Sequence, residues 1–384
     1  MTERKTYKLG DICKRVCSGG TPKSTEPTYY DGDIPWLNTK EINFNRIYST
    51  ERCITQKGLD NSSAKWIDAN CVIVAMYGAT AAKVSINKIP LTTNQACCNL
   101  SIDERIADYH YVYYWLCANY TELASLANGG AQQNLNAQQI KDFEISLPPL
   151  EEQRRIAGIL GAIDDKIENN RRINSNLELQ AQALFDKIFF DDNDAERNPL
   201  SDYADINPTR TLHQGVVARY IEMANLPTRG SFPSDWSYKS YGGGCKFANG
   251  DTIMARITPC LENGKTAYID FLEEQEVAFG STEYIVISAK SGYCPALFYF
   301  LARNKEFVDY AVGHMNGSSG RQRVGGVDIA NFPMPHISLE DSNKFAEIAM
   351  PIMDVIRNNS LENRQLATLR DTLLPKLMNG EIKL

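Results

Sequence analysis

The chain repeats itself at a fixed distance, and this repeat constrains the fold more than any local pattern does. The segment FEISLPPLEEQRRIAGILGAIDDKIENNRRINSNLELQAQAL begins at Phe143 and aligns without a gap with the segment that begins at Phe332, 189 residues later. Upstream, at the same spacing, GAQQ at 130–133 falls against SGRQ at 319–322. A duplicated unit fixes the order of the parts along a chain. The sequence therefore predicts a domain, a helix, a second domain and a second helix.

The second part of each copy has the pattern of one long helix. Prolines precede it, and acidic residues occupy its first turn, where they favour a helix start. Apolar residues then recur at alternating steps of four and three, which predicts that the two helices bury each other as an antiparallel intramolecular coiled coil with a pseudo-twofold axis. The first seam is Ile156, Leu160, Ile163, Ile167, Asn170, Asn174, Leu177, Ala181, Leu184 and Ile188. The second is Phe345, Ala349, Ile352, Ile356, Asn359, Asn363, Leu366, Arg370, Leu373 and Leu377.

Each seam contains two asparagines at equivalent positions, Asn170 with Asn174 and Asn359 with Asn363. A polar residue inside a coiled-coil seam can fix the register of the two helices. One interpretation is that these four residues pair across the helices and set the register. The alternative is a solvated stretch, because polar seam positions are often only partly buried.

The remaining segments are typical of mixed domains, with short β-branched or aromatic runs, turns, and a short helix near each end. The predicted fold class is α+β: two tandem mixed α/β domains separated by two long antiparallel helices. The expected boundaries are a first domain at 1–147, a long helix at 148–190, an acidic linker at 191–197, a second domain at 198–337 and a C-terminal long helix at 338–384.

Composition and missing motifs argue against an enzyme that acts alone. The net charge of −7 disfavours a protein that coats nucleic acid nonspecifically, but it leaves a sequence-specific reader possible. The sequence has no phosphate loop, no zinc-ligand spacing and no glycine-rich turn for a dinucleotide or S-adenosylmethionine. It also lacks a secretory signal and an apolar run near the ~18 residues that span a bilayer. We expect a cytoplasmic protein whose ten cysteines are reduced.

Two loops at equivalent points of the copies carry side chains that suit DNA. Asparagine and glutamine pair with adenine, and arginine pairs with guanine or phosphate. Lysines and an arginine near other turns extend the set, although each such charge by itself is more often an ordinary surface residue. The predicted DNA-binding residues are Lys23, Lys40, Lys83, Gln132, Gln133, Asn134, Arg256, Lys265, Arg321, Gln322 and Arg323.

The chain resembles the specificity (S) subunits of Type I restriction-modification systems. The resemblance covers essentially the whole chain and rests on GGTP at 19–22 with GDIPW at 32–36, PPLEEQRRIA at 148–157 and LLPKLMNGEI at 373–382. One departure is that the second helix opens with SLEDS at 338–342 instead of the usual proline-leucine-acidic-glutamine run.

The resemblance implies a non-catalytic DNA-recognition subunit of a methyltransferase and endonuclease complex. In that family, two target-recognition domains each read one half of a split site in double-stranded DNA. The long helices dock two methyltransferase (M) subunits, and restriction/translocase (R) subunits complete the complex. S-adenosylmethionine, ATP and Mg²⁺ then belong to those partners, and this chain is expected to hold no cofactor or metal and to contact no membrane.

Two other functions remain as alternatives. One is a non-catalytic scaffold with two protein-binding modules on a coiled coil, which would show no sequence-dependent DNA binding. The other is a nuclease with an unrecognised site, for which only the generic Glu381-Ile382-Lys383 is available. The recognition hypothesis predicts a molecular ruler, since two readers on a rod of about 60 Å bind well only when both half-sites present compatible faces.

Overall fold

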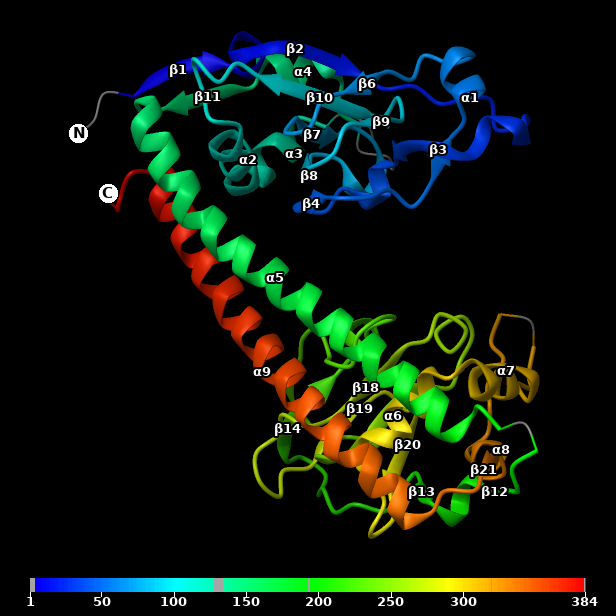
Figure 1. Ribbon diagram of the computed structural model, residues 1–384. Coiled ribbons are helices and arrows are strands. Elements are labelled where there is room, and N and C mark those ends of the chain that lie inside the picture. Colours follow the sequence, from blue (N-terminus) through cyan, green and yellow to red (C-terminus); the bar gives the residue numbers. More distant parts are fainter. Residues whose placement is uncertain (1–3, 128–133, 193, 319, 383) are drawn as a thin grey trace. The chain divides into compact units, whose positions relative to one another are not determined.

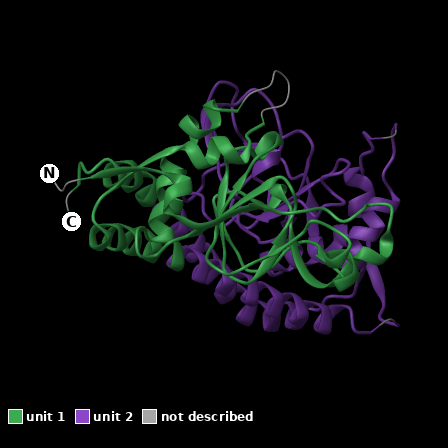
Figure 2. Ribbon diagram, turned by 90° about the horizontal axis from the view of Figure 1, so that it is seen from above, with its two compact units in different colours: residues 1–165, 366–384 green, residues 166–365 purple. Residues whose placement is uncertain are grey.

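A computed structural model describes residues 4–127, 134–192, 194–318, 320–382 and 384. The chain forms two compact units, unit 1 from residues 1–165 with 366–384 and unit 2 from residues 166–365 (Figure 2). Two long helices, α5 (Leu150–Phe189) and α9 (Leu339–Met378), each contribute residues to both units (Figure 1). The predicted long helices and the predicted fold class are confirmed.

Unit 1 contains three sheets. The five-stranded sheet has the order β2 (Cys13–Ser18), β10 (Cys97–Ile102), β7 (Val72–Ala75), β8 (Val84–Asn87) and β4 (Asn45–Ile47). The four-stranded sheet has the order β5 (Cys53–Ile54), β3 (Tyr30–Leu37), β9 (Leu91–Thr93) and β6 (Trp66–Ile67), and β1 (Lys5–Lys8) pairs with β11 (Glu144–Leu147). The short helices are α1 (Gln56–Asp60), α2 (Tyr109–Ala118), α3 (Tyr120–Ser125) and α4 (Ala137–Asp142), with 3₁₀ turns η1 (Leu9–Ile12), η2 (Pro27–Tyr29), η3 (Thr39–Glu41) and η4 (Gly78–Thr80).

Unit 2 has the same arrangement, except that four strands correspond to the five-stranded sheet of unit 1. Its sheets have the orders β13 (Ala204–Ile206), β20 (Tyr284–Ala289), β17 (Thr252–Ala255), β18 (Thr266–Tyr268), and β15 (Ser237–Ser240), β14 (Val217–Ile221), β19 (Ala278–Gly280), β16 (Lys246–Phe247). β12 (Arg197–Pro199) pairs with β21 (Pro333–Pro335). The helices are α6 (Pro295–Arg303), α7 (Lys305–Gly313) and α8 (Gly326–Ala330), with η5 (Leu200–Asp202) and η6 (Met223–Asn225). β3 with β9 and β14 with β19 are equivalent parallel pairs, so the duplication seen in the helices extends through both domains.

The second long helix begins with an unusual sequence, but its first turn makes the same kind of contact as the first turn of α5. In unit 1, the buried Gln153 of α5 accepts a hydrogen bond at Oε1 from the backbone N–H of Asp108, the residue that caps α2 (3.0 Å). In unit 2, the buried Ser342 of α9 accepts at Oγ from the N–H of Cys294, the residue that caps α6 (2.8 Å). A buried N–H without an acceptor is costly, so both residues satisfy the same need with different side chains.

The long helices pair antiparallel within each unit. In unit 2, Asn170 lies against Asn363, and Phe185 packs on Phe345 with ring centroids 5.9 Å apart. In unit 1, Ile156 and Leu160 share a buried cluster with Leu377 and Met378. The heptad pattern thus identified the two surfaces that face each other.

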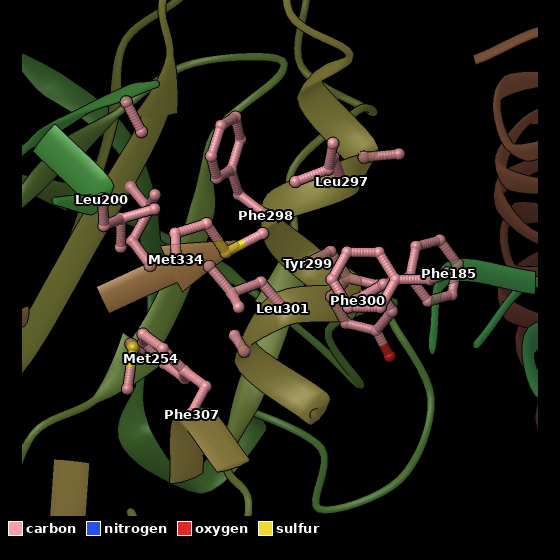
Figure 3. Packing of buried hydrophobic residues seen from close by; sticks show 14 of the residues in the cluster. Phe185, Leu200, Met254, Leu297, Phe298, Tyr299, Phe300, Leu301, Phe307 and Met334 are labelled. Carbon is pink, nitrogen blue, oxygen red and sulfur yellow. The ribbon is translucent and has the colours of Figure 1, made fainter. Parts of the chain in front are cut away.

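The predicted seam is wrong at the end of α5. Ile188 is 37% exposed, whereas Phe185 and Phe189 are 0% and 5% exposed. Both phenylalanines belong to the core of unit 2, where Phe185 lies beside Phe300 of α6 (Figure 3). Here α5 packs on a globular core as well as on α9, so the buried face follows steps of four and departs from the heptad.

Candidate nucleic-acid interface

Three backbone segments of unit 2 meet just after β17. The N–H of Arg256 donates to the carbonyl of Glu283, and the N–H of Val324 donates to the carbonyl of Arg256. Both N···O distances are 3.0 Å. Arg323 forms an isolated antiparallel bridge with Ile257. These bonds hold the loop that contains the predicted arginines against the loop that follows β17. We call the three segments, at 256–257, 283 and 323–324, the loop frame of unit 2.

Unit 1 has the same loop frame after β7. The N–H of Met76 donates to the carbonyl of Ala96, and the N–H of Leu135 donates to the carbonyl of Met76. Both N···O distances are 2.8 Å. Asn134 forms the matching antiparallel bridge with Tyr77. Of the predicted amide residues, Asn134 is exposed in this frame, whereas Gln132 and Gln133 lie outside the described residues.

Lys83 and Lys265 occupy equivalent places, because their carbonyls accept from the N–H groups of Ala75 and Ala255 over 2.9 Å. Both side chains are half-buried and donate to neighbouring segments. Lys83 Nζ donates to Asn43 Oδ1, and Lys265 Nζ donates to the carbonyl of Met223, each over 2.7 Å. In the structure these two lysines therefore fasten the segments beside the loop frame.

The charged residues of the unit 2 frame differ in how they are held. Arg323 Nε lies 2.9 and 2.8 Å from the two carboxylate oxygens of Glu283, and its Nη2 lies 2.6 Å from Oε1. These hydrogen bonds lower the pKa of Glu283. Arg321 is exposed, and Gln322 is half-buried with its carbonyl accepting from the N–H of Thr258 (3.1 Å). No sequence pattern pointed to Glu283, because its role depends on a partner 40 residues away.

Lys23 and Lys40 are both exposed in unit 1. Lys40 lies in η3 and forms an ion pair with Glu51, and the carbonyl of Lys23 accepts from the N–H of Glu26 (3.1 Å). Within the described part of the chain, neither lysine takes part in the hydrogen bonds of the loop frame. The structure thus brings together only part of the predicted DNA-binding set.

The four seam asparagines lie in unit 2 and bond across the helices. Asn170 is 1% exposed, and its Nδ2 donates to Asn363 Oδ1 (3.0 Å) and Glu362 Oε2 (2.7 Å). Asn359 Nδ2 donates to Asn174 Oδ1 over 2.8 Å. Their amides therefore have partners on the opposite helix, which is the arrangement that a register role requires.

A pocket of about 410 Å³ in unit 1 lies between α5 and the start of α2. Its lining includes Arg46, which pairs with Asp165, and Lys88, whose Nζ donates to Asn70 Oδ1 (3.2 Å). Burial lowers the pKa of His110 to about 4, and nearby Lys88 adds to the shift, so this imidazole is neutral at pH 7. Two cations of the pocket, Arg46 and Lys88, are therefore already paired within the unit.

Among the residues that the structure describes, no group of three or more histidine, cysteine, aspartate or glutamate side chains is arranged to hold a metal ion. No described helix combines the length and apolar character needed to cross a bilayer. All ten cysteines are present as free thiols.

Comparisons with known proteins agree with this architecture. Residues 1–179 match the family described as the Type I restriction modification DNA specificity domain. The chain is 25% identical to the Type I restriction enzyme MjaIX specificity subunit of Methanocaldococcus jannaschii, over 98% of this chain and 93% of that protein. It is 22% identical to the HindI specificity subunit of Haemophilus influenzae, over the full length of both. The crystal structure of a Type I restriction-modification S subunit from M. genitalium has the same fold (TM-score 0.61, 16% identity, 98% and 96% coverage).

The matched domain is that of a DNA specificity protein. Residues 1–179 belong to this family, and the chain as a whole is similar to the specificity subunits of Type I restriction-modification systems. The resemblance stated from the sequence is thereby confirmed.

Proposed function

We propose that this chain supplies the DNA sequence specificity of a Type I restriction-modification complex and performs no catalysis itself. Each target-recognition domain, residues 1–147 and 198–337, reads one half of a bipartite site. The segments 148–190 and 338–384 set the spacing of the half-sites and dock two methyltransferase subunits, and 191–197 links the first helix to the second domain. Restriction subunits complete the complex, so S-adenosylmethionine, ATP and Mg²⁺ act in the partners.

The observation that carries this proposal is the loop frame, which occurs at equivalent positions of both units. In each unit, a loop rich in amides or arginines is hydrogen-bonded to the loop that follows the same central strand, β7 or β17. Such side chains match the hydrogen-bonding groups of base edges in a major groove. Two copies of the loop frame in one chain suit a DNA site with two parts.

The paired helices suit a spacer. A helix of 40 residues is about 60 Å long at 1.5 Å per residue, close to two duplex turns of about 34 Å. The cross-helix bonds of Asn170 and Asn174 oppose sliding of α5 along α9. A fixed spacer adds the distance and helical phase of the half-sites to what is recognised.

The near-neutral balance of 40 basic and 47 acidic residues suggests that the chain alone binds DNA weakly. Affinity then rises when the partner subunits close around the duplex. Tight binding of the isolated chain to its site at ~150 mM salt would contradict this part of the proposal.

Mapping of modified adenines across the genome, with and without the gene, tests the function. Loss of methylation at one two-part motif in the deletion strain, and its return on complementation, is the expected result. An unchanged methylation map, together with no sequence preference in DNA binding, would favour the protein-binding scaffold instead.

A further inference from the structure

The two loop frames share a backbone but differ in the chemistry of three equivalent positions. In unit 1 these positions hold Met76, Ala96 and Asn134, of which Met76 and Ala96 are 3% and 7% exposed. In unit 2 the same positions hold Arg256, Glu283 and Arg323. One frame is therefore uncharged, and the other has two cations and one anion.

Within the unit 2 frame, one arginine is satisfied and the other is not. Arg323 uses its guanidinium on the Glu283 carboxylate, and this ion pair is partly exposed (40% and 26%). Among the described residues, the guanidinium of Arg256 has no hydrogen-bond acceptor, and its Nε is buried. Arg256 is half-buried, so a ligand that offers acceptors to the accessible nitrogens of its guanidinium completes the site.

The neighbouring carboxylate is already paired within the frame. Glu283 binds Arg323, so the three charged side chains leave one net positive charge, and among the described residues Arg256 is the one of them whose guanidinium has no acceptor. Two backbone hydrogen bonds fix Arg256 in the frame, and a fixed placement of the fork is what bidentate reading of a base edge requires. The major-groove edge of guanine offers two neutral acceptors, O6 and N7, which match the planar arginine fork.

We infer that Arg256 reads the guanine of a G·C pair in the half-site of unit 2, while the segments of Glu283 and Arg323 position it. This inference rests on the proposed function and adds a base identity to one half-site. The half-site of unit 1 is read without a guanidinium at the equivalent position. The two halves of the target thus differ in the chemistry by which they are read.

The test is a selection of bound duplexes from a randomised library, with the full chain assembled with its methyltransferase subunits. The variants are Arg256→Gln, Arg256→Lys and Glu283→Gln, and Arg229→Gln serves as a control that removes an exposed charge from the same unit. Arg256→Lys keeps the charge but loses the planar fork. The melting temperature and circular dichroism of each variant verify that it is folded.

We expect the unvaried protein to select a bipartite motif with a G·C pair at one position of one half. Arg256→Gln and Arg256→Lys should each relax that position by about tenfold or more and leave the other half unchanged. Glu283→Gln should weaken the same preference, and Arg229→Gln should select the original motif.

Other outcomes separate the two levels of the proposal. A bipartite motif that both Arg256 variants leave intact, with affinity reduced equally for all sequences, would identify a phosphate contact and overturn the inference alone. A changed position without guanine would also overturn it. Absence of any sequence preference in the unvaried complex would overturn the proposed function, and this inference with it.

Discussion

The Nδ2 of Asn359 donates a hydrogen bond to the Oδ1 of Asn174 over 2.8 Å, so an asparagine of α9 is bonded to an asparagine of α5 inside unit 2. Asn174 in turn donates to the carbonyl of Ile356 and to Ser360 Oγ, each over 3.2 Å. A slide of one helix turn would break all three bonds while leaving apolar neighbours able to repack. The polar seam thus distinguishes one register from its competitors.

A double-mutant cycle on Asn174→Ala and Asn359→Ala measures this bond directly. We expect a coupling free energy of about 0.5–1.5 kcal/mol, as for one hydrogen bond between neutral groups. Urea unfolding of the full chain, followed through the transition of unit 2, gives the four free energies. Additive effects of the two substitutions would contradict a direct bond.

Asp164 satisfies the arginine that interrupts the apolar seam of α9. In unit 1, Arg370 Nη1 donates to Asp164 Oδ1 over 2.9 Å, and Tyr114 Oη donates to Asp164 Oδ2 over 2.6 Å. Asp164→Ala leaves both donors without this acceptor, and we expect unfolding free energy to fall by about 2–4 kcal/mol. Tyr114→Phe should cost about 1 kcal/mol.

The control for that substitution is Asp371→Asn, which removes the other carboxylate near Arg370 (2.8 Å) at an exposed position. A surface pair of this kind contributes less than about 1 kcal/mol. Thermal unfolding of the three variants, compared under one buffer condition, gives the ranking. Equal losses for Asp164→Ala and Asp371→Asn would show that Asp164 has no special role.

Asp270 makes the stability of unit 2 depend on pH. Burial raises the pKa of its carboxyl group to about 7, and Asp354 of α9 adds to the rise while Arg357 opposes it. In the unfolded chain this group titrates near its ordinary value of about 3.9. The folded state therefore binds a proton more tightly, so this contribution is full below about pH 4 and is lost as pH rises to about 7.

Asp270→Asn removes that dependence. We expect the variant to raise the melting temperature at pH 8 by roughly 2–4 °C and to have little effect at pH 4.5. Differential scanning calorimetry at the two pH values measures the difference. A larger gain at pH 4.5 than at pH 8 would have the wrong sign for a raised pKa.

Arg321 is the exposed arginine of the unit 2 loop and is predicted to contact a phosphate. Arg321→Gln should reduce the slope of log K against log[salt] by about 1 and weaken binding to all sequences alike. Titrations of the assembled complex at several salt concentrations measure the slope, with Arg229→Gln as the control. A changed base preference in place of a changed slope would assign Arg321 to base reading.

Local patterns in the sequence were sufficient for the elements and their order. The heptad pattern, the preceding prolines and the acidic first turns predicted both long helices, because residues three and four apart lie on the same face of a helix. The duplication predicted two equivalent domains, and the short helix expected in each domain appears as α2 in unit 1 and α6 in unit 2. The resemblance to the family was also identifiable from four short segments.

Only the tertiary structure decided which side chains meet. Asp164 and Arg370 are 206 residues apart, and Arg323 meets Glu283 across 40 residues. No periodicity relates such positions, because their contact depends on how strands and helices pack. For the same reason Phe185 and Phe189 are buried at the end of α5, whereas Ile188 is exposed. The sequence by itself determined the duplicated architecture, whereas long-range packing decided which polar groups are satisfied within the chain and which, as at Arg256, are left for a ligand.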